Sequence, residues 1–395
     1  GPSSYAGFEV KEAFAEAVVP LATDLSFAKA LEVEAAARYS DYDTIGSTTA
    51  WKFGGVWAPV SDLRFRFTRS SDVRAPNLTE LFSPGQNGLT NPNDPCSVTY
   101  INAGSSTRAA NCAALGIPVG YVDGRPGAGK TLTTRGNPNL VPEESKDWTV
   151  GVAFTPSAIP RLKLSVDWWS INIDNAVTNF SAQQIVNGCV DAQTIDNPQC
   201  SQVVRGGTVG GVAVPNTQLS GVIVEPINAA TLKGKGIDFG GQYSVDLPTH
   251  LLNESNVLFL SLDGAYYQEN TTYLSLSPAV HTAGNSTLPK LRANLSMEVV
   301  AGALSLDWNA RFISSSKENV DNPPLFVDDN RVASRFYNDL GGSFDLNDTV
   351  RLKVGINNLF DVIPPGNAYT FEGIGRGGLF DNVGRYLFVE ARARL

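Results

Sequence analysis

The end of the chain alternates between apolar and polar residues with a period of two. Between Gly384 and Leu395 one face carries Leu387, Val389, Ala391, Ala393 and Leu395, and the other carries Phe388, Glu390, Arg392 and Arg394. This period is that of a β-strand, and a strand with one apolar and one charged face separates two different environments. An apolar edge strand promotes aggregation in water, whereas a closed barrel has no free edge and can turn its apolar face to lipid.

Similar alternation recurs along the whole chain and predicts about thirteen strands. Residues 5–19 read as a strand because Pro20 and a following partner disfavour a helix, although 11–22 could also form one. Further strands are expected at 25–39, 49–57, 63–69, 148–154, 162–170, 231–246, 257–267, 291–299, 304–312, 331–346, 350–358 and the C-terminal end.

Short turns and longer loops alternate between these strands, as for the turn predicted at 20–24. The long connections are 71–144, 176–220, 268–289, 313–330 and 361–382, and the first shows almost no periodicity. Loops of this length are improbable in a compact soluble domain but ordinary at the outer end of a membrane barrel. The sequence therefore predicts an all-β fold, an antiparallel transmembrane β-barrel. Aromatic residues near strand ends would suit its interfacial girdles, namely Tyr39, Trp51, Trp57, Trp148, Trp308 and Tyr386.

Composition supports this class and excludes others. Charged residues make up 17% of the 395 residues, and 37 Gly and 23 Pro punctuate the chain. No run approaches the ~18 apolar residues of a membrane helix. The net charge of −9 argues against a nucleic-acid partner.

The four cysteines form two local pairs, Cys96 with Cys112 and Cys189 with Cys200, in strand-poor segments. Neither pair has C-x-x-C spacing, and no His is near enough to complete a metal site. We expect two loop disulfides formed in an oxidising compartment, with free thiols as the alternative.

Two glycine-rich motifs resemble nucleotide-binding loops without their context. Gly124–Thr131 matches G-x-x-x-x-G-K-T, but Gly136 and Pro138 follow where a helix should begin. The G-x-G-x-x-G match at Gly373–Gly378 also lacks a following helix. His250 and His281 are the only histidines, and no nucleophile has a plausible base. We expect no catalytic, cofactor or metal site, and no enzyme.

Three segments resemble signature segments of TonB-dependent outer-membrane receptors. They are Arg74–Phe82 (RAPNLTELF), Asn137–Ser145 (NPNLVPEES) and Val354–Asp361 (VGINNLFD). Together with the last strand, these segments span residues 74–395. The first 70 residues resemble the family only in general character and carry no signature segment. Their roles look structural: Asn357 and Asn358 can bond backbone at a strand end, and Leu359 and Phe360 can anchor it. One departure is Leu395, where the family usually ends in Phe.

The resemblance implies a barrel of about 22 strands around an N-terminal plug, energised by the TonB–ExbB–ExbD system. Residues 1–395 look like the C-terminal part of that barrel, without the plug and early strands. Because the chain begins without Met or a signal sequence, we expect it to be a piece of a longer protein.

The resemblance also implies uptake of a scarce, bulky ligand across the outer membrane of a Gram-negative cell, with outer-membrane lipid as a further partner. An oligosaccharide, another organic nutrient or an iron–siderophore would fit, and the residues that bind it are unknown. A passive porin and a surface-binding β-protein without transport are the alternatives.

Overall fold

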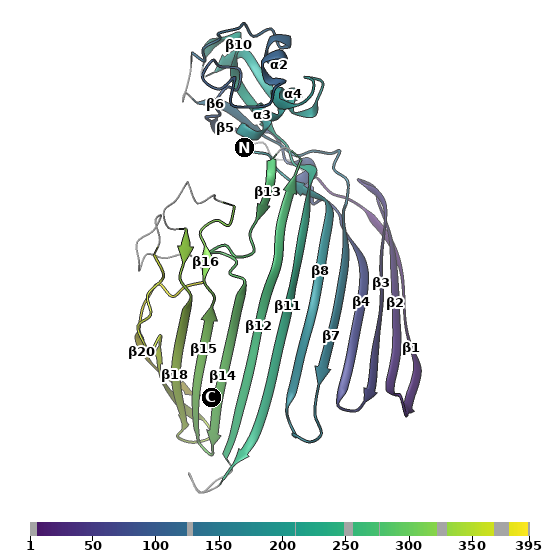
Figure 1. Cartoon of the computed structure of the whole chain (residues 1–395), viewed down its shortest axis with the longest axis vertical. Helices are drawn as coiled ribbons and strands as arrows, with labels where there is room; N and C mark the ends of the chain where they lie inside the picture. Colours follow the sequence, from purple (N-terminus) through teal and green to yellow (C-terminus); the bar gives the residue numbers. More distant parts are fainter. Residues whose placement is uncertain are drawn as a thin grey trace.

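One large, curved antiparallel sheet dominates the fold, and a small domain lies beyond one end of it (Figure 1). The computed structural model describes residues 6–124, 129–209, 211–248, 256–275, 277–321, 330–366 and 379–393. Within these residues the sheet has fourteen strands, of which thirteen follow one another and β13 (Ser277–His281) pairs with β12. The path runs through β1 (Val10–Leu25), β2 (Ala28–Tyr42), β3 (Gly46–Val60), β4 (Leu63–Arg74), β7 (Glu143–Phe154), β8 (Lys163–Thr178), β11 (Ile227–Leu247), β12 (Asn256–Leu274), β14 (Leu291–Ala301), β15 (Leu304–Ile313), β18 (Arg335–Asp345), β19 (Val350–Asn357) and β20 (Tyr386–Ala393).

The sheet is open in the described part of the chain. Strands β1 and β20 each pair on one side only, with β2 and β19. The all-β, antiparallel prediction is confirmed, while closure into a barrel and the total number of strands stay predictions. No helix in the described ranges has the length and apolarity needed to cross a membrane.

The N-terminal segment is a strand, and the helical alternative for 11–22 is wrong. The turn predicted at 20–24 is also wrong, because β1 continues to Leu25 before the chain reverses. Its pairing with β2 shifts register between Pro20 and Ala22. Proline cannot donate a ladder hydrogen bond, and this irregularity accommodates it within the strand.

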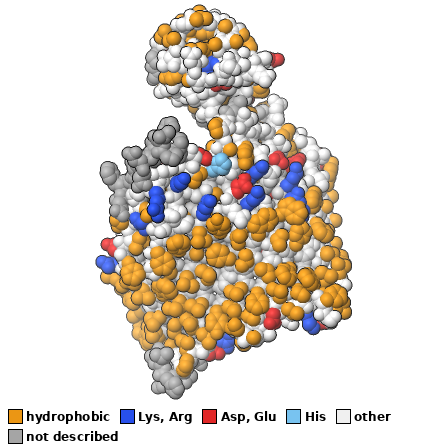
Figure 2. All heavy atoms as spheres, in the orientation of Figure 1, with side chains coloured by type: hydrophobic (Ala, Val, Ile, Leu, Met, Phe, Trp, Pro, Cys, Tyr) orange, Lys and Arg blue, Asp and Glu red, His pale blue; other side chains and the backbone are white. Residues whose placement is uncertain are grey.

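The two faces of the sheet differ as the alternation predicted. One row across β4, β7, β8 and β11 joins Phe65, Val152, Val166 and Phe239, and the next joins Arg66, Gly151, Asp167 and Asp238. The apolar rows form a broad band over the convex face, with charged side chains gathered above and below it (Figure 2). Such a band is the lipid-facing surface of membrane barrels.

Aromatic side chains mark the margins of this band. Near the short turns Trp57 stacks on Phe65, with ring centroids 5.5 Å apart. Near the long loops Trp148 is exposed beside Arg69. Tyr386 does not belong to such a girdle, because it lies on the polar face beside Asn357.

The two longest connections are not irregular, so that prediction is wrong. After α1 (Leu78–Phe82), their described residues 83–124, 129–136, 179–209 and 211–226 fold together into what we call the loop domain. It contains β5 (Gln86–Thr90), β6 (Lys130–Thr134), β9 (Val203–Val209), β10 (Val212–Val224), α2 (Arg108–Ala114), α3 (Ala182–Asp191) and α4 (Pro198–Ser201). Its sheet has the order β5-β6-β10-β9, in which β6 from one connection runs parallel to β10 from the other.

The loop domain has its own core. One apolar cluster comprises Cys96, Cys112, Ile117, Cys189 and Val190, and a second comprises Phe180, Ile185, Val186, Leu219 and Val222. Both expected disulfides are present, Cys96–Cys112 and Cys189–Cys200, with Cα–Cα distances of 5.7 and 4.4 Å. The oxidising compartment inferred from them stays a prediction.

Among the described residues, the elaborated connections all lie at one end of the sheet, although not every connection there is long. Residues 43–45 join β2 and β3 directly at that end. The described residues 277–290, 314–321 and 330–334 lie at this end as well, and β16 (Ser316–Lys317) pairs with β17 (Arg331–Val332). We call this end the loop end and the opposite one the turn end.

Candidate ligand-binding cavity and loop domain

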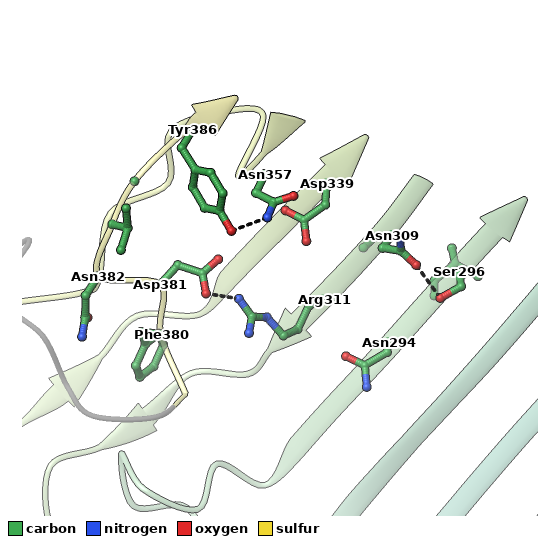
Figure 3. Close-up of a pocket in the computed structure, with 14 residues that line it drawn as sticks. Asn294, Ser296, Asn309, Arg311, Asp339, Asn357, Phe380, Asp381, Asn382 and Tyr386 are labelled. Carbon is green, nitrogen blue, oxygen red and sulfur yellow. Dashed lines mark hydrogen bonds and ion pairs between the residues drawn. The ribbon is translucent and has the colours of Figure 1, made fainter. Parts of the chain in front are cut away.

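A cavity of about 630 Å³ lies on the polar face near the loop end. Ser296 of β14, Asn309 of β15 and Asp339 of β18 stand opposite one another across the strands. Asn357 of β19 and Tyr386 of β20 continue the lining. Strand alternation directs all five toward the same side, and they surround one space (Figure 3).

The other wall of the cavity is the segment that leads into β20. Phe380 is only 5% exposed and packs in an apolar cluster with Ile313, Val332 and Tyr337. The next residue, Asp381, forms an ion pair with Arg311 (Figure 3). The Arg311 guanidinium lies 4.7 Å from the centre of the Tyr337 ring. These contacts fix the segment against the sheet.

Amides and hydroxyls dominate the chemistry of the cavity. Ser296 Oγ donates to Asn309 Oδ1 at 2.7 Å, and Asn357 Nδ2 donates to Tyr386 Oη. Asp381 already neutralises Arg311. The lining can therefore offer many directional hydrogen bonds with little net charge, which suits a polar ligand rich in hydroxyl or carbonyl groups.

A second cavity, of about 450 Å³, adjoins the first along the same face. The two share Asn294 and Arg311. Asp263 accepts from Asn294 Nδ2 at 3.0 Å, and Arg292 donates to Tyr267 Oη at 2.9 Å. Together they give an elongated surface of mixed polar and apolar side chains that extends from β20 to β11.

Buried ion pairs join the two halves of the loop domain. Arg205 binds both oxygens of the fully buried Asp94, at 2.7 and 2.8 Å. Arg108 likewise binds Asp191. Although burial opposes it, the hydrogen bonds from Arg108 and Ser105 hold the pKa of Asp191 below its ordinary value. The domain is thus a preorganised unit.

The loop domain is attached to the rest of the loop end. Gln184 Nε2 of α3 donates to Ser277 Oγ of β13 at 2.6 Å, and Leu274 packs against the second apolar cluster. At the other end of β13, His281 Nδ1 lies 2.7 Å from Asp321 Oδ1. Contacts therefore run from the loop domain to segment 314–321.

The first signature segment organises the place where the chain leaves the sheet. Arg74 binds Glu143 through two nitrogens, at 2.7 and 2.6 Å, and also reaches Glu80 at 3.0 Å. Asn77 and Glu80 form a capping box that starts α1. The motif joins the end of β4 to the start of β7, which is a structural role.

The last signature segment shapes the start of the β19–β20 connection. Asn358 exchanges hydrogen bonds with the backbone of Val362, at 2.9 and 2.8 Å. Asn357 instead bonds the side chain of Tyr386, and Phe360 is 67% exposed. The expected backbone role therefore holds for Asn358, while Asn357 bonds a side chain instead, and the expected anchoring role of Leu359 and Phe360 stays a prediction.

The glycine-rich motifs and the histidines are described only in part. Residues 125–128, His250, 373–378 and Leu395 fall outside the described ranges. Thr131 belongs to strand β6, and Lys130 pairs with Asp123 at 3.4 Å inside the loop domain. Among described residues, no group of three or more His, Cys, Asp or Glu side chains is arranged to hold a metal ion.

The cavity residues were not identified from the sequence. They come from five strands that are scattered over about a hundred residues, and only the pairing register brings them together. The available signal was the run of amide and hydroxyl residues at alternate positions, as at Asn294 and Ser296. That signal marks a polar face and not a site.

Comparison with protein families gives a match over most of the chain. Residues 2–359 match the family model described as "TonB dependent receptor-like, beta-barrel". No curated protein sequence matches at a significant level.

Solved structures with a similar fold include two bacterial receptors and a bacterial iron transporter. One is a ferric enterobactin receptor from Pseudomonas aeruginosa, with a TM-score of 0.60 and 14% identity, over 98% of this chain and 45% of that one. The siderophore receptor PirA from Acinetobacter baumannii gives a TM-score of 0.59 and 12% identity, over 98% and 46%. The FrpB iron transporter from Neisseria meningitidis gives 0.52 and 10%, over 98% and 44%. This chain spans less than half the length of these neighbours.

Proposed function

This chain belongs to the TonB-dependent receptor family, and we propose that it forms the C-terminal part of an outer-membrane barrel that takes up a scarce, bulky ligand with energy from TonB–ExbB–ExbD. The family is one of outer-membrane barrels. The apolar band, the elaborated loop end and the polar cavities on the opposite face support the proposal.

Strand parity supports completion of the barrel by further strands. In an antiparallel path of thirteen strands, the first and last strands run in the same direction. They therefore cannot pair with each other antiparallel, so closure needs an odd number of additional strands. We propose that earlier strands of the complete receptor supply them, for a total of about 22, and that an N-terminal plug occupies the lumen.

A polar, uncharged oligosaccharide is the ligand class that the larger cavity supports best. Its lining of Ser296, Asn309, Asn357 and Tyr386 offers hydroxyls and amides, and its one arginine is neutralised by Asp381. An iron–siderophore is the second candidate, because two of the structural neighbours are described as siderophore or ferric enterobactin receptors.

Binding to the purified complete receptor tests the ligand class. We expect a panel of neutral oligosaccharides to contain a binder whose affinity falls about tenfold in Asn309→Ala/Ser296→Ala, the loss of one or two net hydrogen bonds. Ser165→Ala, on the same face but in β8 and outside the cavity, is the matched control. Tight binding of ferric chelates alone, unaffected by the double substitution, would refute the assignment.

Energy dependence separates uptake from passive diffusion. In cells that produce the complete receptor, uptake of the bound ligand should stop when TonB is deleted or a protonophore is added. Uptake that continues unchanged would support a porin instead. Binding without any uptake would support a surface-binding protein.

A further inference from the structure

Trp169 of β8 is the one tryptophan on the polar face of the sheet. All six tryptophans lie in the described ranges, and the others stand at positions of the apolar face. Strand pairing sets Trp169 opposite Thr149 of β7 and Gly236 of β11, in the polar-face row next to the one that contains Asp167 and Asp238. The indole therefore faces the same side as the two cavities and not the lipid.

Two glycines of β11 let this indole lie against the sheet. A Cβ at Gly236 would come within 2.5 Å of the six-membered ring of Trp169, and a Cβ at Gly234 within 3.3 Å of it. A larger residue at either position would push the ring away from the backbone. One side of the ring thus packs on β11. Because Trp169 is still partly exposed, the other side is open toward the polar face.

Tyr267 of β12 holds the indole in place beside the second cavity. The two ring centres lie 6.1 Å apart, with the ring planes at 76°. Arg292 donates to Tyr267 Oη at 2.9 Å, and its guanidinium lies 5.3 Å from the centre of the Tyr267 ring. Arg292 also lines the cavity of about 450 Å³. The aromatic pair therefore continues the surface of that cavity toward β8.

Hydrogen-bonding groups flank the open side of the indole. The Trp169 N–H has no acceptor among the described residues. Other indole N–H groups of the sheet donate to a carbonyl or amide oxygen, namely those of Trp57, Trp168 and Trp308. Asp238, the next polar-face residue after Gly236, lines the second cavity, is exposed and has no ion pair within the described part of the chain. A donor and an acceptor are thus available around one aromatic face.

An open aromatic face with a donor and an acceptor at its rim fits a pyranose. In a sugar ring whose hydroxyls are all equatorial, the axial C–H groups form a flat apolar face and the hydroxyls point outward. Such a face packs on an aromatic ring while the hydroxyls reach polar groups at its edge. The Asp238 carboxylate would repel an anionic ferric chelate, whereas it can accept from a sugar hydroxyl.

We propose that Trp169 is a stacking platform for one glucose-type pyranose of the transported oligosaccharide. Its N–H donates to one sugar hydroxyl, Asp238 accepts from another, and Tyr267 positions the indole. From Trp169 on β8 to Arg311 on β15 the surface crosses four strand spacings, roughly 19 Å, so a chain of several sugars is needed to occupy it. This inference rests on the proposed function and specifies the sugar that it would bind.

The test titrates the complete receptor with cellohexaose and maltohexaose, two neutral hexasaccharides of glucose, by calorimetry and by tryptophan fluorescence. Trp169→Leu should lower the affinity of the hexasaccharide that binds about tenfold, because the aromatic face is lost. Trp169→Phe keeps an aromatic face and loses only the N–H, so its loss should be about threefold. The fluorescence change on binding should vanish in both variants. The matched control is Trp168→Leu, the neighbouring tryptophan on the apolar face, which should retain the affinity and the fluorescence change.

Four results would overturn the proposal: unchanged affinity in Trp169→Leu, equal affinities in the Leu and Phe variants, an equal loss in the control, or no binding of either hexasaccharide to the unsubstituted receptor. If Trp169→Leu does not fold, the lost fluorescence change and the moderate loss of affinity in Trp169→Phe still carry the test. Uptake by cells that produce the same variants separates the two hypotheses. TonB-dependent uptake that is unaffected by the substitutions at Trp169 would leave the proposed function standing without this platform, whereas the absence of any TonB-dependent uptake would count against the proposed function itself.

Discussion

The ion pair between Asp94 and Arg205 offers the sharpest test that the loop domain is one folded unit. Asp94 has no exposed surface and accepts from two Arg205 nitrogens and from the Cys96 N–H, at 3.0 Å for the last. Arg205 has a side chain only 11% exposed. The two residues come from different connections of the large sheet, so their pairing joins segments that the sequence separates widely.

Asp94→Asn leaves the Arg205 guanidinium buried without its counter-charge. Breaking a buried pair on one side costs about 3–5 kcal/mol. A unit on the order of 100 residues has a stability of about 5–15 kcal/mol, so this loss is a large fraction of it. Hydrogen exchange of the amides in β6 and β10 should then accelerate by roughly two to four orders of magnitude. Exchange in the membrane strands should not change.

Asp196→Asn is the matched control, because this exposed carboxylate lies in the loop domain, on the connection that carries Arg205, and has no ion pair among the described contacts. Its effect should stay within about 0.5 kcal/mol. Equal exchange in the two variants would refute the reasoning. Acceleration confined to one connection would also refute it, because the two would then fold separately. The double variant Asp94→Asn/Arg205→Met should recover part of the lost stability, since it also removes the buried, unpaired charge of Arg205.

Three further outcomes are expected. Gly151→Ala should destabilise the sheet by about 1–3 kcal/mol in urea unfolding, because the added Cβ would lie 1.9 Å from Asp167 Oδ1. The control is Gly240→Ala, whose added Cβ would meet its nearest atom at 3.4 Å and should cost less. The loop domain should keep its stability as the pH falls from 7 toward about 4, and lose stability at lower pH. The reason is that Arg108 lowers the folded-state pKa of the Asp191 carboxylate, which resists protonation until the pH approaches that lowered pKa. Protease resistance measured during an acid titration checks this. Reduction should add about four hydrogens to the intact mass and increase proteolysis of the loop domain, with the sheet unaffected.

Much of the sheet could be predicted because each strand carries its own signal. In β15, for example, Leu306 and Trp308 alternate with Asp307 and Asn309, and the structure pairs them outward and inward accordingly. The first turn lies elsewhere than the sequence predicts, because Pro20 usually ends a strand but is accommodated here by a register shift. Tyr386 shows the limit of the aromatic signal, because an aromatic residue suits both a lipid margin and a polar cavity, and only the pairing with Asn357 places it on the polar face.

The sequence by itself determined the period of the strands, the two faces of the sheet, the local cysteine pairs and the family resemblance. These follow from neighbours along the chain, where alternation and spacing can be read directly. Only the tertiary structure decided that two seemingly irregular connections share a sheet and a core, and that five strands place Ser296, Asn309 and Tyr386 around one cavity. The physical reason is that the parallel pairing of β6 with β10 and the register between strands depend on contacts between residues far apart in the chain. Such contacts produce no periodic pattern in the sequence of either segment alone.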